Sequence, residues 1–259
     1  MLAYGRFRLV SDNPETIIHG FHGFLGASSD FELLNRVFSR TSLIGHDLVG
    51  HGTHIENSLA GFYTDAQVRF WRNNLPNKSI LLGYSMGGRL ALQLACQYPD
   101  FLKGLILVGA SPGLEDPDEQ KNRQRWDRKM AGELSAGMKY FLGLWNELSI
   151  ISSQRNIERA HHEKMQKTRL FQDPYQLQRS LMLFGTGTMP SCWHLLGKLR
   201  LPVLLIAGEH DLKYCNIAKK MDVILAHSKM RIISDAGHCC HLEQPRQTAQ
   251  IIETWLENM

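Results

Sequence analysis

The sequence lacks any long apolar segment. None of its 259 residues lies in a run that approaches the ~18 to 20 consecutive apolar residues needed to span a bilayer. The first residues, Met1 to Arg6, also lack the apolar core of a signal peptide. These absences predict a cytoplasmic protein without membrane insertion.

The sequence is also poor in patterns that would hold a disulfide or a metal. Its five cysteines are odd in number and form no C-x-x-C pair, which argues against a disulfide framework and a structural zinc site. The neighbours His161 and His162 would point about 100° apart on a helix, so they could not easily share an ion. We therefore expect free thiols, no metal and no cofactor.

A strong charge of one sign is absent. The formal net charge of +4 is too small and too dispersed to indicate a nucleic-acid-binding surface. Residues 115–200 nevertheless carry fourteen Lys and Arg against ten Asp and Glu, whereas the remainder has fifteen of each. This local excess indicates either a solvated surface or a segment that covers an active site for an anionic ligand.

Short apolar runs bounded by turn residues recur along the chain. With 43% hydrophobic residues, the chain is large enough for one α/β domain with a sizeable core. Helical patterns separate most of the runs, which favours a largely parallel sheet covered by helices on both faces. The expected strands include residues 16–18, 41–44, 79–82, 104–108, 203–206 and 231–233, and the alternating residues 6–10 predict a further edge strand.

This alternation of strands and helices stops after residues 110–113. From Asp118 to about Phe184 the chain has the pattern of several charged, amphipathic helices, and Pro202 restarts the strand pattern. We expect a core formed by residues 1–114 and 201–259, with residues 115–200 inserted as a helical lid. An insertion at this point places helices over the carboxyl edge of the sheet.

Ser85 lies between two glycines in Gly83-Tyr84-Ser85-Met86-Gly87, directly after an apolar run and before a helical pattern. This is typical of a nucleophile elbow, a sharp strand-to-helix turn that accepts only small residues two positions before and after the serine. The turn would aim the backbone N–H of Met86 at a negative charge that forms beside Ser85. Taken alone, the motif could also be a glycine-rich connection.

An acid and a base follow two later apolar runs. Asp211 comes after residues 203–208, and His238 comes after residues 230–235. The order Ser, Asp, His along the chain is that of the α/β-hydrolase triad. Asp211 would then orient the imidazole of His238, which would accept the proton of Ser85.

The segment after the first expected strand contains two consecutive His-Gly-Phe sequences, at residues 19–21 and 22–24. We favour His22-Gly23-Phe24, because it follows the apolar run by a few residues. The backbone N–H of Phe24 would then be the second donor to a developing oxyanion. We expect His22 itself to brace the loop, since His238 already fills the role of base.

Together these motifs resemble those of the α/β-hydrolases, and within them the 2-succinyl-6-hydroxy-2,4-cyclohexadiene-1-carboxylate synthases of menaquinone biosynthesis. The resemblance spans nearly the whole chain. The matching segments are residues 22–26, 83–89, 111–114 and 185–187, with Arg123, Asp127, Trp145, Arg169 and Trp193. The segments Cys239-Cys240-His241 and Met189-Pro190 depart from the family's pattern.

The resemblance implies a carbon–oxygen lyase that eliminates pyruvate from 2-succinyl-5-enolpyruvyl-6-hydroxy-3-cyclohexene-1-carboxylate. Ser85, deprotonated toward His238, would remove a ring proton, and the amides of Phe24 and Met86 would stabilise the enolate oxygen. Guanidinium groups bind carboxylates bidentately, so arginines suit this anionic substrate. The implied substrate contacts are Arg89, Arg123, Arg169, Tyr84 and Trp145. The protein would bind no nucleic acid and would be a monomer or a small homo-oligomer.

Two other functions fit parts of the sequence. A serine hydrolase, either a carboxylesterase or a C–C bond hydrolase, would use the same three residues with water as its second substrate. Arginines in the lid distinguish the two enzymes, because a neutral ester does not require them. A non-catalytic ligand receptor with this fold would not need Ser85, Asp211 and His238 together.

Overall fold

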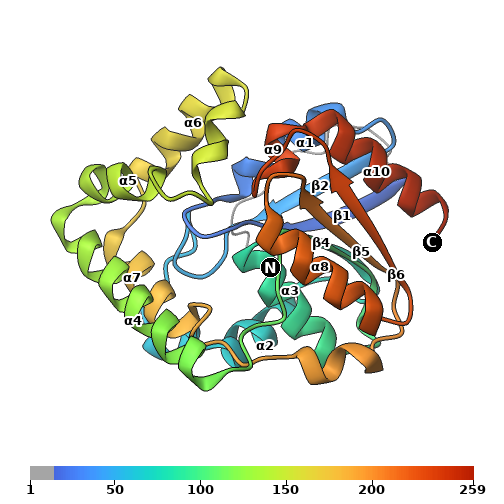
Figure 1. The fold of residues 1–259 in the computed structure, drawn as a ribbon, viewed down its shortest axis with the longest axis horizontal. Helices are drawn as coiled ribbons and strands as arrows, with labels where there is room; N and C mark the ends of the chain where they lie inside the picture. The colour runs from blue at the N-terminus through green and yellow to red at the C-terminus, as the bar shows by residue number, and fades with distance from the viewer. Residues whose placement is uncertain (1–14) are drawn as a thin grey trace.

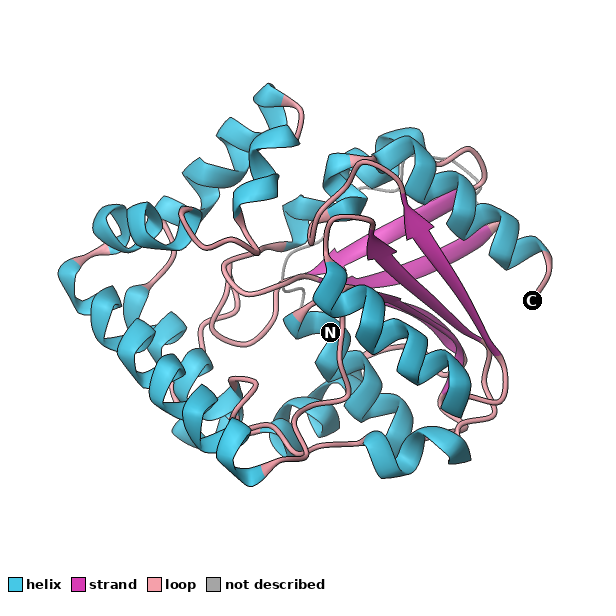
Figure 2. Cartoon of the chain, in the orientation of Figure 1, coloured by secondary structure: helices cyan, strands magenta, loops and turns pink. Residues whose placement is uncertain are grey.

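The computed structural model describes residues 15–259, in which six parallel strands form one sheet in the order β2-β1-β3-β4-β5-β6. Figures 1 and 2 show this sheet on one side of the molecule. The strands are β1 (Thr16–Phe21), β2 (Thr41–His46), β3 (Ser79–Tyr84), β4 (Leu102–Val108), β5 (Val203–Gly208) and β6 (Ser228–Ile233). The six predicted strands are confirmed, whereas the expected edge strand at residues 6–10 lies outside the described residues.

The burial of the strands explains their apolar sequences. Every residue of β3 and β5 is buried, as expected for central strands of a parallel sheet that is covered on both faces. Alternate side chains point to opposite faces, so Leu81 and Leu82 belong to two separate apolar clusters. The edge strand β6 is half exposed and has polar residues among its apolar ones.

Helices cover both faces of the sheet. On one face, α2 (Thr64–Asn74), α3 (Met86–Gln97) and α8 (Leu212–Ile224) bury apolar side chains such as Leu90 and Met221. On the other face, α1 (Glu32–Val37), α9 (Cys240–Glu243) and α10 (Pro245–Glu257) bury Leu34 and Ile252. The result is a three-layer arrangement with a parallel sheet in the middle.

Four longer helices are inserted between β4 and β5. They are α4 (Pro117–Glu133), α5 (Met138–Asn146), α6 (Arg159–Leu170) and α7 (Pro174–Phe184), and they lie beside the sheet in Figure 1. Asp116 and Asp173 cap α4 and α7 by accepting hydrogen bonds from two backbone N–H groups each, and proline follows each cap. A third apolar cluster joins α4, α5 and α7 to Leu25 of the core.

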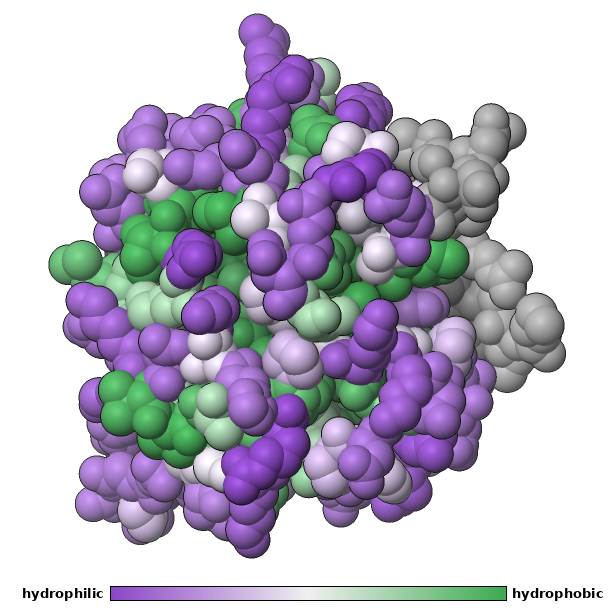
Figure 3. All heavy atoms as spheres, turned by 90° about the vertical axis from the view of Figure 1, so that its right-hand side faces the viewer, coloured by the Kyte–Doolittle hydropathy of each residue, from purple (hydrophilic) through white to green (hydrophobic). Residues whose placement is uncertain are grey.

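Short 3₁₀ helices complete the chain: η1 (Ser28–Phe31), η2 (Leu59–Phe62), η3 (Leu134–Ala136), η4 (Ser152–Asn156) and η5 (Trp193–Lys198). No helix within residues 15–259 is long and apolar enough to cross a membrane. The face shown in Figure 3 is mainly hydrophilic, and its apolar groups are separated by hydrophilic side chains. Such a distribution is ordinary for a protein surface in contact with water.

Candidate active site

Ser85 lies at the turn between β3 and α3, in a strained conformation with φ of 50° and ψ of −107°. The glycines around it are required by close backbone contacts. A Cβ atom at Gly83 would lie 2.5 Å from Cα of Gly88, and one at Gly87 would lie 2.3 Å from the carbonyl oxygen of Phe21. The predicted sharp turn is therefore present, with the serine at its tip.

Ser85, His238 and Asp211 form one hydrogen-bonded row. His238 Nε2 lies 3.0 Å from Ser85 Oγ, and His238 Nδ1 lies 2.6 Å from Asp211 Oδ2. The acid and the imidazole are buried. The imidazole also contacts two aromatic rings, with centroid distances of 5.3 Å to Tyr84 and 4.5 Å to Tyr214. This packing leaves the ring little freedom to turn away from Ser85.

Phe24 and Met86, whose N–H groups are the predicted oxyanion donors, both line the cavity that contains Ser85. Met86 is the first residue of α3, so its N–H has no intrahelical acceptor. The N–H of Phe24 donates no hydrogen bond to another described residue. Both groups are therefore free to bind an oxyanion beside Ser85.

His22 braces the loop that carries Phe24, as expected. Its buried ring contacts the carbonyl oxygen of Gly23 through Nδ1 at 2.7 Å, and its Nε2 accepts the N–H of Leu48 at 3.0 Å. This pattern places the proton on Nδ1 and keeps the ring neutral. Burial also lowers the pKa of His22, which favours the same state.

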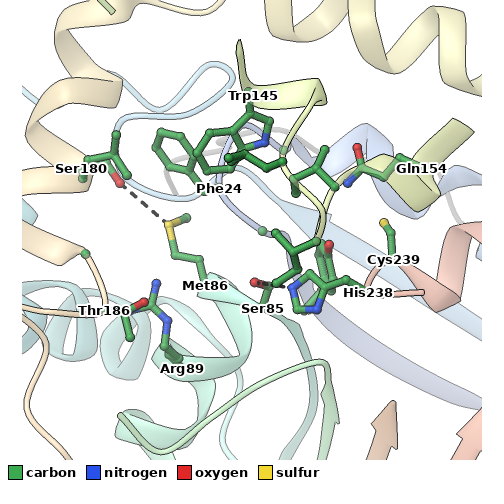
Figure 4. Close-up of a pocket in the computed structure, with 18 of the residues that line it drawn as sticks. Phe24, Ser85, Met86, Arg89, Trp145, Gln154, Ser180, Thr186, His238 and Cys239 are labelled. Atoms are coloured by element: carbon green, nitrogen blue, oxygen red, sulfur yellow. Dashed lines mark hydrogen bonds between the residues drawn. The ribbon is translucent and has the colours of Figure 1, made fainter. Parts of the chain in front are cut away.

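A cavity of about 340 Å³ opens in front of Ser85. Nine of the ten site residues predicted from the sequence line this cavity. The tenth, Asp211, lies behind His238, to which it is hydrogen-bonded. Figure 4 shows Phe24 and Trp145 together on one wall of the cavity and Arg89 with Thr186 on a second. Gln154 lies on a third side, away from Arg89. The volume is that of a typical small-molecule site.

Arg89 is a buried cation without a counter-ion. Its side chain makes only long contacts, at 3.5 Å to the carbonyl oxygen of Phe184 and 3.8 Å to Sδ of Met189. It forms no ion pair with any carboxylate of the described chain. Burial, with a smaller contribution from the charge of Arg123, lowers the pKa of Arg89 to about 10. A carboxylate bound here would replace the lost hydration of the guanidinium.

Arg169, which also lines the cavity, is buried as well. Its Nη1 donates to Gln154 Oε1 at 2.9 Å, while its buried Nε has no partner in the part of the chain described. Asp30, also in the lining, is not close enough to form an ion pair with it. Burial raises the pKa of Asp30 to about 6, and the charge of Arg169 opposes that rise. Arg169 thus has donor capacity left for an anion.

Arg123 differs from the other two arginines. Its Nε donates to Asp127 at 2.8 Å, its guanidinium lies over the ring of Trp126, and its side chain is 32% exposed. It is therefore already neutralised in part. The structure brings all three predicted arginines to one cavity but leaves only Arg89 and Arg169 without a carboxylate partner.

The two predicted aromatic contacts also line the cavity. Trp145 packs on Phe24 at a centroid distance of 5.1 Å, and its buried Nε1 has no acceptor among the described residues. Burial, with a smaller contribution from Cys239, raises the pKa of the Tyr84 hydroxyl, and the Tyr84 ring packs against the imidazole of His238. Trp145 can therefore donate to a ligand, whereas Tyr84 supports His238 from behind.

Several residues of the lining were not predicted from the sequence. Tyr214 stands in the first turn of α8, where its N–H donates to Asp211 at 3.3 Å, and this position three residues after an acidic N-cap was a usable signal. Gln154, Ser180 and Thr186 have no comparable signal, because they depend on how the inserted helices fold back over the core.

Metal and thiol chemistry find no support in the residues present. Within residues 15–259, no group of three or more His, Cys, Asp or Glu side chains is placed to hold a metal ion. Cys239 and Cys240 are buried, and burial raises the pKa of both thiols. They therefore stay protonated and unreactive.

Comparison with known proteins extends over the whole chain. A family model described as alpha/beta hydrolase fold matches residues 17–245. The chain is 34% identical to the Bacillus subtilis (strain 168) protein named "Putative 2-succinyl-6-hydroxy-2,4-cyclohexadiene-1-carboxylate synthase", over 98% of this chain and 96% of that protein. It is 28% identical to an Enterobacter sp. (strain 638) protein named 2-succinyl-6-hydroxy-2,4-cyclohexadiene-1-carboxylate synthase, over 88% of this chain and 86% of that protein.

A solved structure is similar at the same scale. The structure of MenH from S. aureus has a TM-score of 0.90 and 30% sequence identity, and the match covers 100% of this chain and 99% of that chain. The similarity therefore includes the inserted helices as well as the sheet.

Proposed function

Because the chain belongs to the α/β-hydrolase fold family and to the group of relatives named above, we propose that it is a 2-succinyl-6-hydroxy-2,4-cyclohexadiene-1-carboxylate synthase of menaquinone biosynthesis. The reaction is an elimination from 2-succinyl-5-enolpyruvyl-6-hydroxy-3-cyclohexene-1-carboxylate. A ring proton leaves, the carbon–oxygen bond to the enolpyruvyl group breaks, and pyruvate departs. The enzyme is then a carbon–oxygen lyase.

One observation carries this proposal: the cavity of Ser85 contains two buried arginines without carboxylate partners. The proposed substrate has three carboxylates, on the ring, the succinyl chain and the enolpyruvyl group. Both arginines line the cavity, and Figure 4 shows Arg89 well apart from Gln154, the hydrogen-bond partner of Arg169. The two guanidinium groups can therefore bind two of these carboxylates and fix the ring between them. Arg123 can bind the third at the more exposed edge.

The hydrogen-bonded row supplies the base. Ser85 gives its proton to His238 Nε2 and its oxygen removes the ring proton, while Asp211 stabilises the imidazolium. The electron pair moves into the enolate of the succinyl ketone, whose oxygen the N–H groups of Phe24 and Met86 stabilise. The enolate then expels the enolpyruvyl oxygen, and the pyruvate enolate takes up the proton that His238 holds.

The inserted segment acts as a lid in this reaction. Trp145, Gln154 and Ser180 come from residues 115–200 and close the cavity opposite Ser85. They exclude water, which would otherwise weaken each carboxylate–arginine contact. The five free cysteines fit a reducing compartment, so we place the reaction in the cytoplasm.

A serine hydrolase is the second candidate. The 3.0 Å distance from Ser85 Oγ to His238 Nε2 is also that of a serine nucleophile and its base. In that case Ser85 would attack an ester carbonyl and form an acyl-enzyme. The two buried arginines would then have no function for a neutral ester.

The direct test is pyruvate release from the enolpyruvyl substrate by the purified protein, followed through lactate dehydrogenase and NADH oxidation. We expect rapid release by the wild-type protein and a severe loss in Ser85→Ala. Pyruvate release no faster than in buffer, from a correctly folded protein, would refute the proposal.

A further inference from the structure

Glu243, the last residue of α9, collects hydrogen bonds from both sides of His238. Its Oε2 accepts the N–H of Gly237 at 2.7 Å, and its Oε1 accepts the N–H of Cys239 at 3.1 Å. The residue is only 8% exposed. These two bonds hold the backbone immediately before and after the proposed base, and both N–H groups would be left unsatisfied without them.

The third donor to Glu243 comes from the inserted segment. The hydroxyl of Ser153, in η4, donates to Glu243 Oε1 at 2.9 Å. The packing at this point is tight, because a Cβ atom added to Gly237 would lie 2.2 Å from Ser153 Oγ. The turn of η4 therefore rests directly on the loop that carries His238.

The next residue of the same turn contacts the anion-binding side of the cavity. Gln154 is buried and accepts the Nη1 of Arg169 at 2.9 Å, and Figure 4 shows its side chain directed toward the cavity. Neighbouring residues of η4 thus contact the histidine loop and the arginine. An anion on the free Nε of Arg169 would hold η4 in place through Gln154.

We propose that Glu243 and Ser153 are positioning residues, which fix His238 against Ser85 when η4 is packed on the core. Glu243 orders the loop by charge-assisted bonds to two backbone groups, and Ser153 makes that order depend on the inserted segment. The kinetic part of this inference rests on the proposed function. Its structural part concerns the protein without substrate and stands separately.

Glu243→Gln tests the positioning role. Glutamine keeps one acceptor oxygen and turns the other position into a donor, which cannot accept from a backbone N–H. We expect kcat for pyruvate release to fall about 10- to 100-fold with KM changed less than about 3-fold, because a small misplacement of a base affects the chemical step. An unchanged kcat in a folded variant would overturn the proposal.

Ser153→Ala keeps the test valid if Glu243→Gln fails to fold. It removes one hydroxyl at a partly buried site, and we expect kcat to fall about 3- to 10-fold. In the double variant the loss should be smaller than the product of the single losses, since both act through one contact. Independent, multiplying losses would contradict the shared role.

Glu253 offers a matched control. Its carboxylate also accepts two backbone N–H groups and a serine hydroxyl, from Ser39 N and Arg40 N at 2.9 Å and from Ser39 Oγ at 2.7 Å. It lies in α10 and does not line the cavity. Glu253→Gln and Ser39→Ala should leave kcat at the wild-type value. An equal fall of kcat in these controls would show a general loss of structure and overturn the proposal.

Proton NMR of the substrate-free protein provides a readout independent of turnover. The 2.6 Å contact between His238 Nδ1 and Asp211 should give a downfield N–H resonance. We expect Glu243→Gln and Ser153→Ala to shift or broaden it, and Glu253→Gln to leave it in place. A resonance unchanged in both site variants would overturn the positioning role, whereas missing pyruvate release by the wild type would refute only the proposed function.

Discussion

At the scale of single residues, the cavity combines the hydrogen-bonded row of Ser85, His238 and Asp211 with two buried arginines that form no ion pair with a carboxylate of the described residues. A buried guanidinium loses hydration, and without a carboxylate partner that loss destabilises the substrate-free protein. We therefore propose that Arg89 and Arg169 serve to bind an anionic ligand and do not contribute to folding stability. Arg123 forms an ion pair with Asp127, so its presence is consistent with a role in binding or in folding.

The arginines should differ in their contributions to catalysis. We expect Arg89→Ala and Arg169→Ala each to lower kcat/KM by on the order of 2 to 4 kcal/mol, because each leaves a buried substrate carboxylate unpaired. Arg123→Ala should lower it by about 1 kcal/mol or less, since its site is partly exposed and screened. Steady-state kinetics of pyruvate release measures all three. Wild-type kinetics in both buried-site variants would contradict the anion pocket.

Removal of the buried charge should stabilise the protein. Arg89→Met keeps most of the apolar volume of the side chain and removes the desolvated cation, so we expect the free energy of unfolding to rise by about 1 kcal/mol. Urea unfolding of the substrate-free protein measures this change. A clear loss of stability would show that Arg89 has a structural role that its long contacts do not reveal.

The hydrogen-bonded row of Ser85, His238 and Asp211 should behave as one unit in catalysis. Ser85→Ala, His238→Ala and Asp211→Asn each remove part of the same transfer, so each single variant should lower kcat by ~10³-fold or more and the double variants should lose little beyond that. Turnover of single and double variants under identical conditions tests this. Losses that multiply would mean that the residues act separately.

At the scale of the elements, sequence alone predicts the interior of the sheet well. The fully buried strands β3 and β5 have continuous apolar sequences that only a two-sided core explains. The edge strand β6 begins at Ser228, earlier than the predicted residue 231, because its first residues, Ser228 and Lys229, are polar and do not extend the apolar run. The short 3₁₀ helices have no periodicity to detect.

The candidate site, like the sheet, is predictable from sequence only in part. Ser85, Asp211 and His238 stand just after strands, where sequence order and context identify them. The roles expected for the arginines depend on the resemblance to a family. Ser153 and Glu243, 90 positions apart, meet only because η4 folds back on the core. No local sequence pattern encodes that contact.

The start of α7 should depend on its cap. Asp173 accepts the N–H groups of Tyr175 and Gln176 at 2.8 and 3.4 Å. Asp173→Ala leaves both donors to water, so we expect the free energy of unfolding to fall by about 1 kcal/mol. Thermal unfolding measures the change, with Asp173→Asn as a control that retains a capping oxygen. Equal stability of wild type and Asp173→Ala would mean that the cap contributes nothing.

At the scale of the whole molecule, buried histidines link stability to pH. Burial lowers the pKa of His19 to about 4 and those of His51 and His241 to about 3, below the value near 6.5 of an unfolded chain. The unfolded state therefore binds more protons as pH falls below 6.5, so this stabilisation is complete above that pH and is lost toward pH 4 and 3. Asp30, with its pKa raised to about 6, has the opposite effect.

The protein should consequently be less stable at pH 5 than at pH 7.5. Each histidine should lose on the order of 1 to 2 kcal/mol over this interval, and Asp30 should offset about 1 kcal/mol of the sum. Urea unfolding at the two pH values, with His19→Gln as a comparison, measures the dependence. Stability that rises toward pH 5 would contradict neutral, buried imidazoles.

The central claim is that Ser85 acts as a base toward an anionic substrate and not as an acyl acceptor. The most direct measurement records, on one preparation, pyruvate release from the enolpyruvyl substrate and p-nitrophenol release from p-nitrophenyl acetate, including its first turnover. We expect rapid pyruvate release together with slow ester hydrolysis and no burst of covalent intermediate. Efficient ester turnover with an acyl-enzyme burst and no pyruvate would contradict the claim and identify the protein as a serine hydrolase.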